Sequence, residues 1–161
     1  MTEGPKHPAA IDTQILIFAL RTKFKDDDQK QLAARSRELL KMLHDTSTPI
    51  VLSLISVGEY LVGVEERRRA MVGQELVERF RIAPYNLRAA VVAAGLVPEA
   101  KKLVDGDRQL LMADCKIVGS IVTYPCKVFY THDAKLRKLA EPVLNVHGLP
   151  PQLSLDLGDA K

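Results

Sequence analysis

Short apolar segments rich in β-formers alternate along this chain with longer segments of helical periodicity. The strand-like segments are residues 8–13, 49–56, 81–85, 127–131 and 142–148. The helical segments are residues 14–22, 27–44, 58–80, 87–104, 110–123 and 133–140, and Pro98 is expected to end or kink the fourth. This alternation predicts βαβ units with right-handed crossovers. The expected fold is therefore α/β, a three-layer sandwich with a central, mainly parallel β-sheet flanked by helices.

The 161 residues are enough to bury the core of one domain without disulfides or a structural metal. We expect a single domain over residues 1–149 and a loose C-terminal extension over residues 150–161. The apolar stretch 50–64 is too short to span a bilayer and carries Glu59 near its middle. Residues 1–10 do not resemble a signal peptide, and Cys115 and Cys126 fit no paired metal-ligand spacing. Reduced thiols and a cytoplasmic location are therefore expected.

Two aspartates stand where predicted strands end. Asp12 follows the strand-like residues of segment 8–13, and Asp133 follows segment 127–131. Ligands of open parallel α/β sheets bind beyond the carboxyl ends of the strands, so both carboxylates are candidate site residues. The structural alternative is that each aspartate only caps the helix that follows it.

Glu59 comes shortly after the second strand-like segment. Ser56 and Glu59 match the S-x-x-E pattern of a capping box, which is a purely structural explanation. Glu59 also lies at helical spacing from Ile55 and Val62, and this spacing predicts that its side chain faces the protein rather than water.

Asp114 interrupts an apolar helical stripe. The stripe consists of Leu110, Leu111, Ile117, Val118 and Ile121. A carboxylate on a packed helix face costs several kcal/mol unless a cation, a hydrogen-bond donor or a metal compensates it. A buried pair with an arginine is the structural alternative.

Four acids gathered at one place would raise one another's pKa values unless a multivalent cation lay among them. An all-oxygen site of this kind suits Mg²⁺ or Mn²⁺. Such a site supports metal-assisted hydrolysis of a phosphodiester, in which the metal activates water and stabilises the developing charge. Outside the four acids, the chain carries 23 basic and 16 acidic residues, a balance that suits a polyanionic partner.

These residues, in this order, resemble the PIN-domain ribonucleases over about residues 8–147. The best match is the small single-domain type that serves as the toxin of bacterial and archaeal toxin–antitoxin pairs. The resemblance implies that Asp12, Glu59, Asp114 and Asp133 are metal ligands, and that the hydroxyl of Thr131 orients a carboxylate or water. It also implies Mg²⁺- or Mn²⁺-dependent endonucleolytic cleavage of RNA, a homodimer, and an antitoxin that blocks the site.

The chain departs from the family's pattern at several positions. Many members place another acid shortly after the T-x-D motif, where this chain has Lys135 and Leu136. This departure bears on whether a second metal ion is held. Lys116 stands where small residues are usual, and Asp105 and Asp107 are possible auxiliary acids in a segment that has the composition of a loop.

Other reaction classes fit poorly. No phosphate-binding G-x-x-x-x-G-K-[ST] loop, G-x-S-x-G elbow or H-E-x-x-H helix occurs in the sequence. A haloacid-dehalogenase-type phosphatase needs an acid where Gln14 stands. The alternative from another class is a non-catalytic PIN-like module that binds RNA or a protein. Basic residues near the expected site (Lys135, Arg137, Lys138) suit binding and cleavage equally.

Overall fold

A five-stranded parallel sheet forms the centre of the protein in the computed structural model, which describes residues 7–103 and 108–151. The strand order is β3-β2-β1-β4-β5, and every neighbouring pair is parallel. The strands are β1 (Ala9–Ile11), β2 (Ile50–Ser53), β3 (Arg81–Ala83), β4 (Val128–Tyr130) and β5 (Asn145–His147). The α/β class, the five strand positions and the parallel central sheet expected from the sequence are all confirmed.

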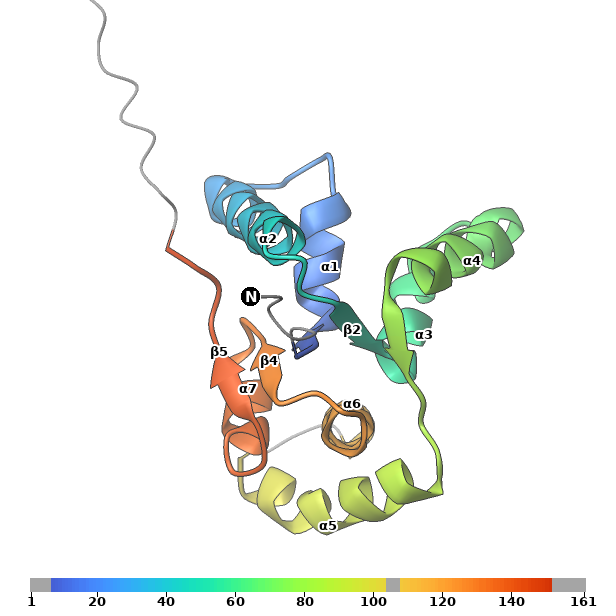
Figure 1. The fold of residues 1–161 in the computed structure, drawn as a ribbon, viewed down its shortest axis with the longest axis vertical. Coiled ribbons are helices and arrows are strands. Elements are labelled where there is room, and N and C mark those ends of the chain that lie inside the picture. The colour runs from blue at the N-terminus through green and yellow to red at the C-terminus, as the bar shows by residue number, and fades with distance from the viewer. Residues whose placement is uncertain (1–6, 104–107, 152–161) are drawn as a thin grey trace, which may run out of the picture.

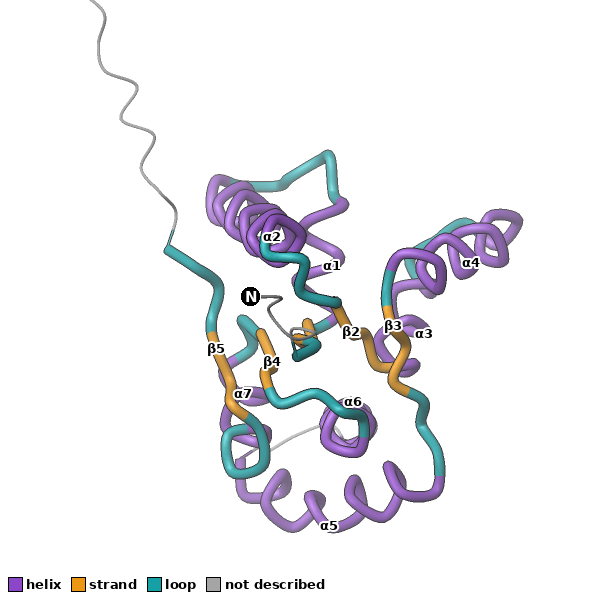
Figure 2. Tube along the Cα trace, viewed as in Figure 1, coloured by secondary structure: helices purple, strands orange, loops and turns teal. Residues whose placement is uncertain are grey.

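Seven α-helices and one 3₁₀ helix connect the strands within the described residues (Figure 1). They are α1 (Thr13–Leu20), α2 (Asp27–Asp45), α3 (Leu54–Val62), η1 (Glu66–Arg68), α4 (Arg69–Arg79), α5 (Leu87–Leu103), α6 (Arg108–Thr123) and α7 (Ala134–Ala140). Figure 2 shows the α1–α2 and β3–α5 connections as loops. Residues 105, 107 and 152–161, which carry the predicted auxiliary acids and most of the predicted C-terminal extension, lie outside the described residues.

The segment after β2 differs from the prediction. The strand ends at Ser53 and the helix begins at Leu54, so the expected strand 49–56 is too long. Ser53, rather than Ser56, is the N-cap, and its Oγ accepts the backbone N–H of Ser56 at 3.0 Å. The predicted capping box of Ser56 and Glu59 is therefore wrong, since both residues lie inside α3.

The single helix predicted over residues 58–80 is also wrong, because the chain bends between α3 and α4. α3 ends at the C-cap Gly63, and a 3₁₀ turn precedes α4. Arg69 Nε donates to the carbonyl oxygens of Leu61 and Val64, which leave the helical ladder at this bend. The two helices form an arm on one side of the molecule (Figure 1).

Pro98 lies inside a helix instead of ending it. α5 runs from Leu87 to Leu103 with Pro98 in its last turns. Proline removes one backbone hydrogen bond and favours a kink. α5 packs against α6, and Ala93 and Ala100, one on each side of Pro98, are both buried in the core that the two helices share.

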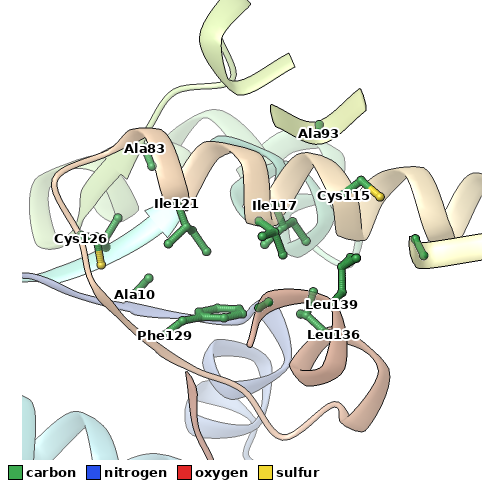
Figure 3. Close-up of a cluster of buried hydrophobic side chains, with 14 of the residues drawn as sticks. Ala10, Ala83, Ala93, Cys115, Ile117, Ile121, Cys126, Phe129, Leu136 and Leu139 are labelled. Atoms are coloured by element: carbon green, nitrogen blue, oxygen red, sulfur yellow. The ribbon is translucent and has the colours of Figure 1, made fainter. Parts of the chain in front are cut away.

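Side chains alternate between two apolar cores, one on each face of the sheet. Ala10, Val51, Ala83 and Phe129 contribute to the core under α5, α6 and α7. Figure 3 shows Phe129 below Ile117 and Ile121 of α6, with Leu136 and Leu139 of α7 beside them. Neighbouring strand residues such as Ala9, Ile11 and Leu52 contribute to the other core, with Leu16 of α1 and Leu39 of α2. The period of two is that of a sheet covered on both faces.

Because all five strands are parallel, their carboxyl ends meet at one edge of the sheet. Asp12 directly follows β1, Ser53 ends β2 and Thr131 directly follows β4. The ladder continues for one step beyond the strands, since Asp12 N–H donates to Tyr130 O and Thr131 N–H donates to His147 O, both at 3.0 Å. No helix within the described ranges is long and apolar enough to cross a membrane.

Candidate active site

Three residues from two strand ends form a hydrogen-bonded chain. Thr131 Oγ1 donates to Asp12 Oδ2 at 3.1 Å and accepts the backbone N–H of Asp133 at 3.0 Å. Asp12 and Thr131 are 3% and 1% exposed. The hydroxyl therefore links the end of β1 to the loop after β4.

Asp12 and Asp133 differ in how they serve the helices that follow them. Asp12 is the N-cap residue of α1, but its side chain accepts no capping hydrogen bond. The capping explanation therefore leaves its buried carboxylate unexplained. Asp133 does cap α7, because its Oδ1 accepts the backbone N–H groups of Lys135 and Leu136 at 2.8 and 3.0 Å. Its other oxygen takes no part in the cap.

Glu59 reaches the same edge of the sheet from α3. Its Oε2 accepts the hydroxyl of Thr13 at 2.7 Å, across 46 residues of sequence. Its side chain is exposed, so the prediction that Glu59 faces the protein is wrong. The stripe used for that prediction included Val62, which is 77% exposed, whereas the buried residues of α3 are Ser56 and Val57.

Asp114 lies half-buried on α6, where Leu111, Ile117, Val118 and Ile121 are buried as predicted. Leu110 is 68% exposed, so its assignment to this stripe is wrong. Leu111 is one residue further along and 100° around the helix, and it alone of the two leucines faces the core. Among the described side chains, no arginine pairs with Asp114. Lys135 is the cation beside it, and the two line a small cavity of about 10 Å³ with Leu111 and Leu139.

The carboxylates interact electrostatically. Burial, opposed by the Thr131 hydrogen bond and assisted by the charges of Asp133 and Glu59, raises the pKa of Asp12 from 3.8 to about 7. Burial and the same two charges raise the pKa of Asp114 from 3.8 to about 6, and Lys135 opposes this rise. Asp12 and Asp114 thus each interact with Asp133 and Glu59. Removal from water is the larger cause for both, and repulsion among the acids is the smaller.

The four carboxylates do not form a compact ligand set. Within the part of the chain that the structure describes, no three Asp, Glu, His or Cys side chains are close enough together to hold a metal ion. The donors are nevertheless all carboxylate oxygens, the type that Mg²⁺ and Mn²⁺ accept, and such ions keep several waters and take only one or two carboxylates directly. The chemistry of this donor set fits a hydrated divalent ion rather than a tight protein cage.

Two residues of the site were not predicted as such. The hydroxyl of Thr13 donates a hydrogen bond to Glu59. In the sequence, Thr13 could be noticed as a site residue only because it stands next to Asp12. Lys135 was noted only as a basic residue and as a departure from a family pattern. Its position beside Asp114 depends on how α7 packs against α6, which no local pattern encodes.

Comparison with known proteins identifies the family. A family model described as PIN domain matches residues 9–142. The chain belongs to the PIN-domain family. PIN domains are in general nucleases, and members typically use divalent metal ions. A sequence comparison with curated proteins finds no match.

Solved structures share the PIN fold at low sequence identity. DNA-bound VapBC from Salmonella typhimurium is 20% identical with a TM-score of 0.61, and the match covers 88% of this chain and 98% of the other. VapBC2 from Rickettsia felis, bound to a promoter DNA fragment, is 16% identical with a TM-score of 0.60 and the same coverages. FitAcB from Neisseria gonorrhoeae is 19% identical with a TM-score of 0.58, covering 86% and 95%. The chain thus shares the fold of these proteins over most of its length.

Proposed function

We propose that this PIN domain is an endoribonuclease that hydrolyses RNA phosphodiester bonds with the help of Mg²⁺ or Mn²⁺. The observation that supports the proposal is that Asp12 and Asp114 each interact electrostatically with Glu59 and Asp133, and that the pKa values of Asp12 and Asp114 are both raised. Burial and neighbouring negative charge raise these pKa values, and a divalent cation bound among the carboxylates would displace the protons and offset the repulsion.

The proposed ligands are Asp12, Glu59, Asp114 and Asp133. When bound, the metal would supply Lewis-acid stabilisation of charge at the phosphate and a water of lowered pKa. Thr131 fixes the rotamer of Asp12 through its 3.1 Å hydrogen bond. Thr13 does the same for Glu59, so two ligands are held in place before any ion binds.

We further propose that the chain is the toxin of a toxin–antitoxin pair, that it acts in the cytoplasm as a homodimer, and that an antitoxin protein blocks its site. The VapBC and FitAB structures that share the fold support the toxin and the antitoxin. The homodimer finds support on α5, where Leu87 and Val91 lie one turn apart and are 80% and 66% exposed. Large apolar side chains exposed together often mark a protein contact.

A second candidate is a PIN-like module that binds RNA or protein without cutting. The distances between the carboxylates favour this non-catalytic module, because no three of the described acids are close enough together to hold a metal ion. Metal-dependent cleavage separates the two candidates.

The test is incubation of the purified chain with labelled single-stranded and structured RNA in Mg²⁺, in Mn²⁺ and in EDTA. We expect cleavage only with a divalent ion, and loss of at least a hundredfold in rate for Asp12→Asn and Asp114→Asn. Asp28→Asn is the matched control, because Asp28 is an exposed acid in the first turn of α2 and is not one of the proposed ligands. Cleavage that persists in EDTA would rule out the metal mechanism, and a wild-type chain that cuts no RNA would favour the binding module.

A further inference from the structure

A second cleft lies beside the carboxylates, and the proposed chemistry leaves it unused. It has a volume of about 490 Å³ and lies between the C-terminal end of α1, the loop that follows it, and α3. Its lining includes Ile17, Leu20, Arg21, Lys23, Glu59 and Tyr60. A cleft of this size falls in the range of roughly 300–1,000 Å³ that small organic ligands occupy.

The lining of the cleft combines apolar and cationic residues. Ile17 and Leu20 of α1 and the ring of Tyr60 on α3 provide apolar surface. Arg21 and Lys23 provide two positive charges, against the single negative charge of Glu59. Apolar surface beside paired cations complements a molecule that carries both a flat base and a phosphate.

Two contacts position the guanidinium of Arg21. Arg21 Nη1 donates to Gln29 Oε1 at 3.2 Å, and its guanidinium lies 5.6 Å from the centre of the Phe18 ring. Gln29 Oε1 also accepts the backbone N–H of Lys25 at 3.2 Å, which fixes the other end of the loop. An arginine held by an aromatic ring and a side-chain amide needs little reordering when it binds a phosphate.

The end of α1 would repel an anion if its carbonyl groups were uncovered, since a helix C-terminus carries partial negative charge. Arg37 of α2 covers it: Nε donates to Ala19 O at 2.9 Å, and Nη2 donates to Arg21 O. The guanidinium of Arg37 thus offsets the negative end of the α1 dipole. It also adds a third positive charge close to Arg21.

Glu59 joins the cleft to the carboxylate site. Its side chain lines the cleft, while its Oε2 is bonded to Thr13, the residue next to Asp12. A chain of nucleotides with its scissile phosphate at the carboxylates therefore has the cleft as a neighbouring position.

We propose that this cleft is a subsite for one unpaired nucleotide of an RNA strand, adjacent to the bond that is cut. The base packs against Tyr60, Leu20 and Ile17, and the phosphate binds Arg21 and Lys23. The proposal rests on the proposed function for the identity of the substrate, but its binding step needs neither metal nor cleavage. The cleft thereby selects single-stranded segments, because a paired base cannot enter it.

The test is the affinity of a fluorescein-labelled single-stranded 12-nucleotide RNA, followed by anisotropy in EDTA so that binding is measured without cutting. Arg21→Gln with Lys23→Gln is expected to weaken binding about tenfold and to lower the slope of log affinity against log salt by about 1.4. Tyr60→Leu is expected to weaken binding about fivefold or more while keeping the slope. A hairpin that pairs the same bases should bind the wild type more weakly than the single strand does.

The matched control is Lys30→Ala with Lys41→Ala, which removes two exposed charges of α2 that are paired with Asp27 and Asp45. It should bind single-stranded RNA within about twofold of the wild type. Thermal unfolding of each variant shows whether the fold is kept. Lys23→Gln alone, at an exposed position, is the gentler variant should the first variants unfold, and it should lower the slope by about 0.7.

The proposal is overturned if the variants at Arg21, Lys23 and Tyr60 bind the RNA as tightly as the wild type. That result would be expected if the cleft held a peptide instead of a nucleotide. Equal losses in the control and groove variants overturn it too, because they would indicate general charge attraction. Cleavage by the wild type in Mg²⁺ is scored separately. If the RNA binds through the cleft but is never cut, the nuclease proposal fails and the subsite proposal stands. If the wild type cuts RNA and the cleft variants bind RNA normally, the subsite proposal fails and the nuclease proposal stands.

Discussion

The hydroxyl oxygen of Thr131 makes hydrogen bonds to two residues that carry carboxylates, Asp12 and Asp133. It donates to Asp12 Oδ2 and accepts the N–H that positions Asp133. Its hydrogen bond also lowers the pKa of Asp12, against the larger effect of burial. Thr131 therefore acts through the positions of Asp12 and Asp133 and through the charge of Asp12, rather than on RNA directly.

Replacement of Thr131 by valine is expected to raise the pKa of Asp12 above its present value of about 7, because the donor is lost while burial remains. The rate of RNA cleavage at pH 7 should fall about tenfold or more, and the pH at which cleavage is half-maximal should move upward. Thr131→Ser keeps the hydroxyl and should retain the wild-type pH profile. Identical profiles for all three proteins would contradict a positioning role.

Asp12 also makes the stability of the metal-free protein depend on pH. Its pKa is about 7 in the folded state and 3.8 as its ordinary value. Between these values the folded protein binds the proton and the unfolded chain does not, so folding stability is highest at low pH and falls as pH rises from about 4 to 7. The full loss is on the order of 4 kcal/mol for a group this buried.

Asp12→Asn should therefore unfold at a higher temperature than the wild type at pH 8 in EDTA, and the gain should be much smaller at pH 4. Asp114→Asn should behave in the same direction with a smaller gain, because Asp114 is only half-buried. Thermal melts at the two pH values measure both effects. A large drop in melting temperature for Asp114→Asn at pH 8 would instead indicate a buried partner that stabilises its charge.

At the scale of secondary-structure elements, α5 and α6 approach each other closely at Gly119. A Cβ atom at Gly119 of α6 would lie 2.5 Å from the carbonyl oxygen of Ala89 and 3.1 Å from the backbone nitrogen of Ala93, both on α5. Backbone atoms cannot yield as a flexible side chain can, so the two helices can pack this closely only with glycine at position 119. Asp114 lies on the same helix, and its place at the sheet edge depends on this contact.

Gly119→Ala is expected to lower the free energy of unfolding by about 1–3 kcal/mol, because α6 must move away from α5. Gly95→Ala is the matched control on α5, where the added methyl group meets nothing within 4 Å. That change should be neutral or stabilising by up to about 1 kcal/mol, the helix propensity difference between the two residues. Urea denaturation measures both, and equal stabilities would contradict the close packing.

For the whole molecule, the exposed apolar residues of α5 bear on oligomeric state. Leu87 and Val91 share one helix face and are largely exposed. If this face is the proposed dimer contact, Leu87→Lys with Val91→Lys should convert the wild-type dimer to a monomer in light scattering. Val62→Lys, at a 77% exposed position on α3, is the control and should stay dimeric. A monomeric wild type would refute the homodimer.

The sequence by itself determined the order of strands and helices and most of the residues that reach the site. These features are local: apolar β-rich segments, helical periodicity, and a carboxylate directly after a strand depend on neighbouring residues alone. Parallel strands then force Asp12 and Asp133 to one edge, and Asp114 was noticeable because it interrupts an apolar stripe. The break between α3 and α4 was missed, since it depends on Arg69 binding carbonyl groups several residues away.

Only the tertiary structure decided how the acids are held and what lies beside them. Thr13 to Glu59, Thr131 to Asp12, and Lys135 beside Asp114 are contacts between segments far apart in the chain. The cleft beside Glu59 likewise forms only where the end of α1 faces α3. Distances, burial and pKa values follow from the packing of helices onto the sheet, and that packing is settled by the two cores together rather than by any one segment.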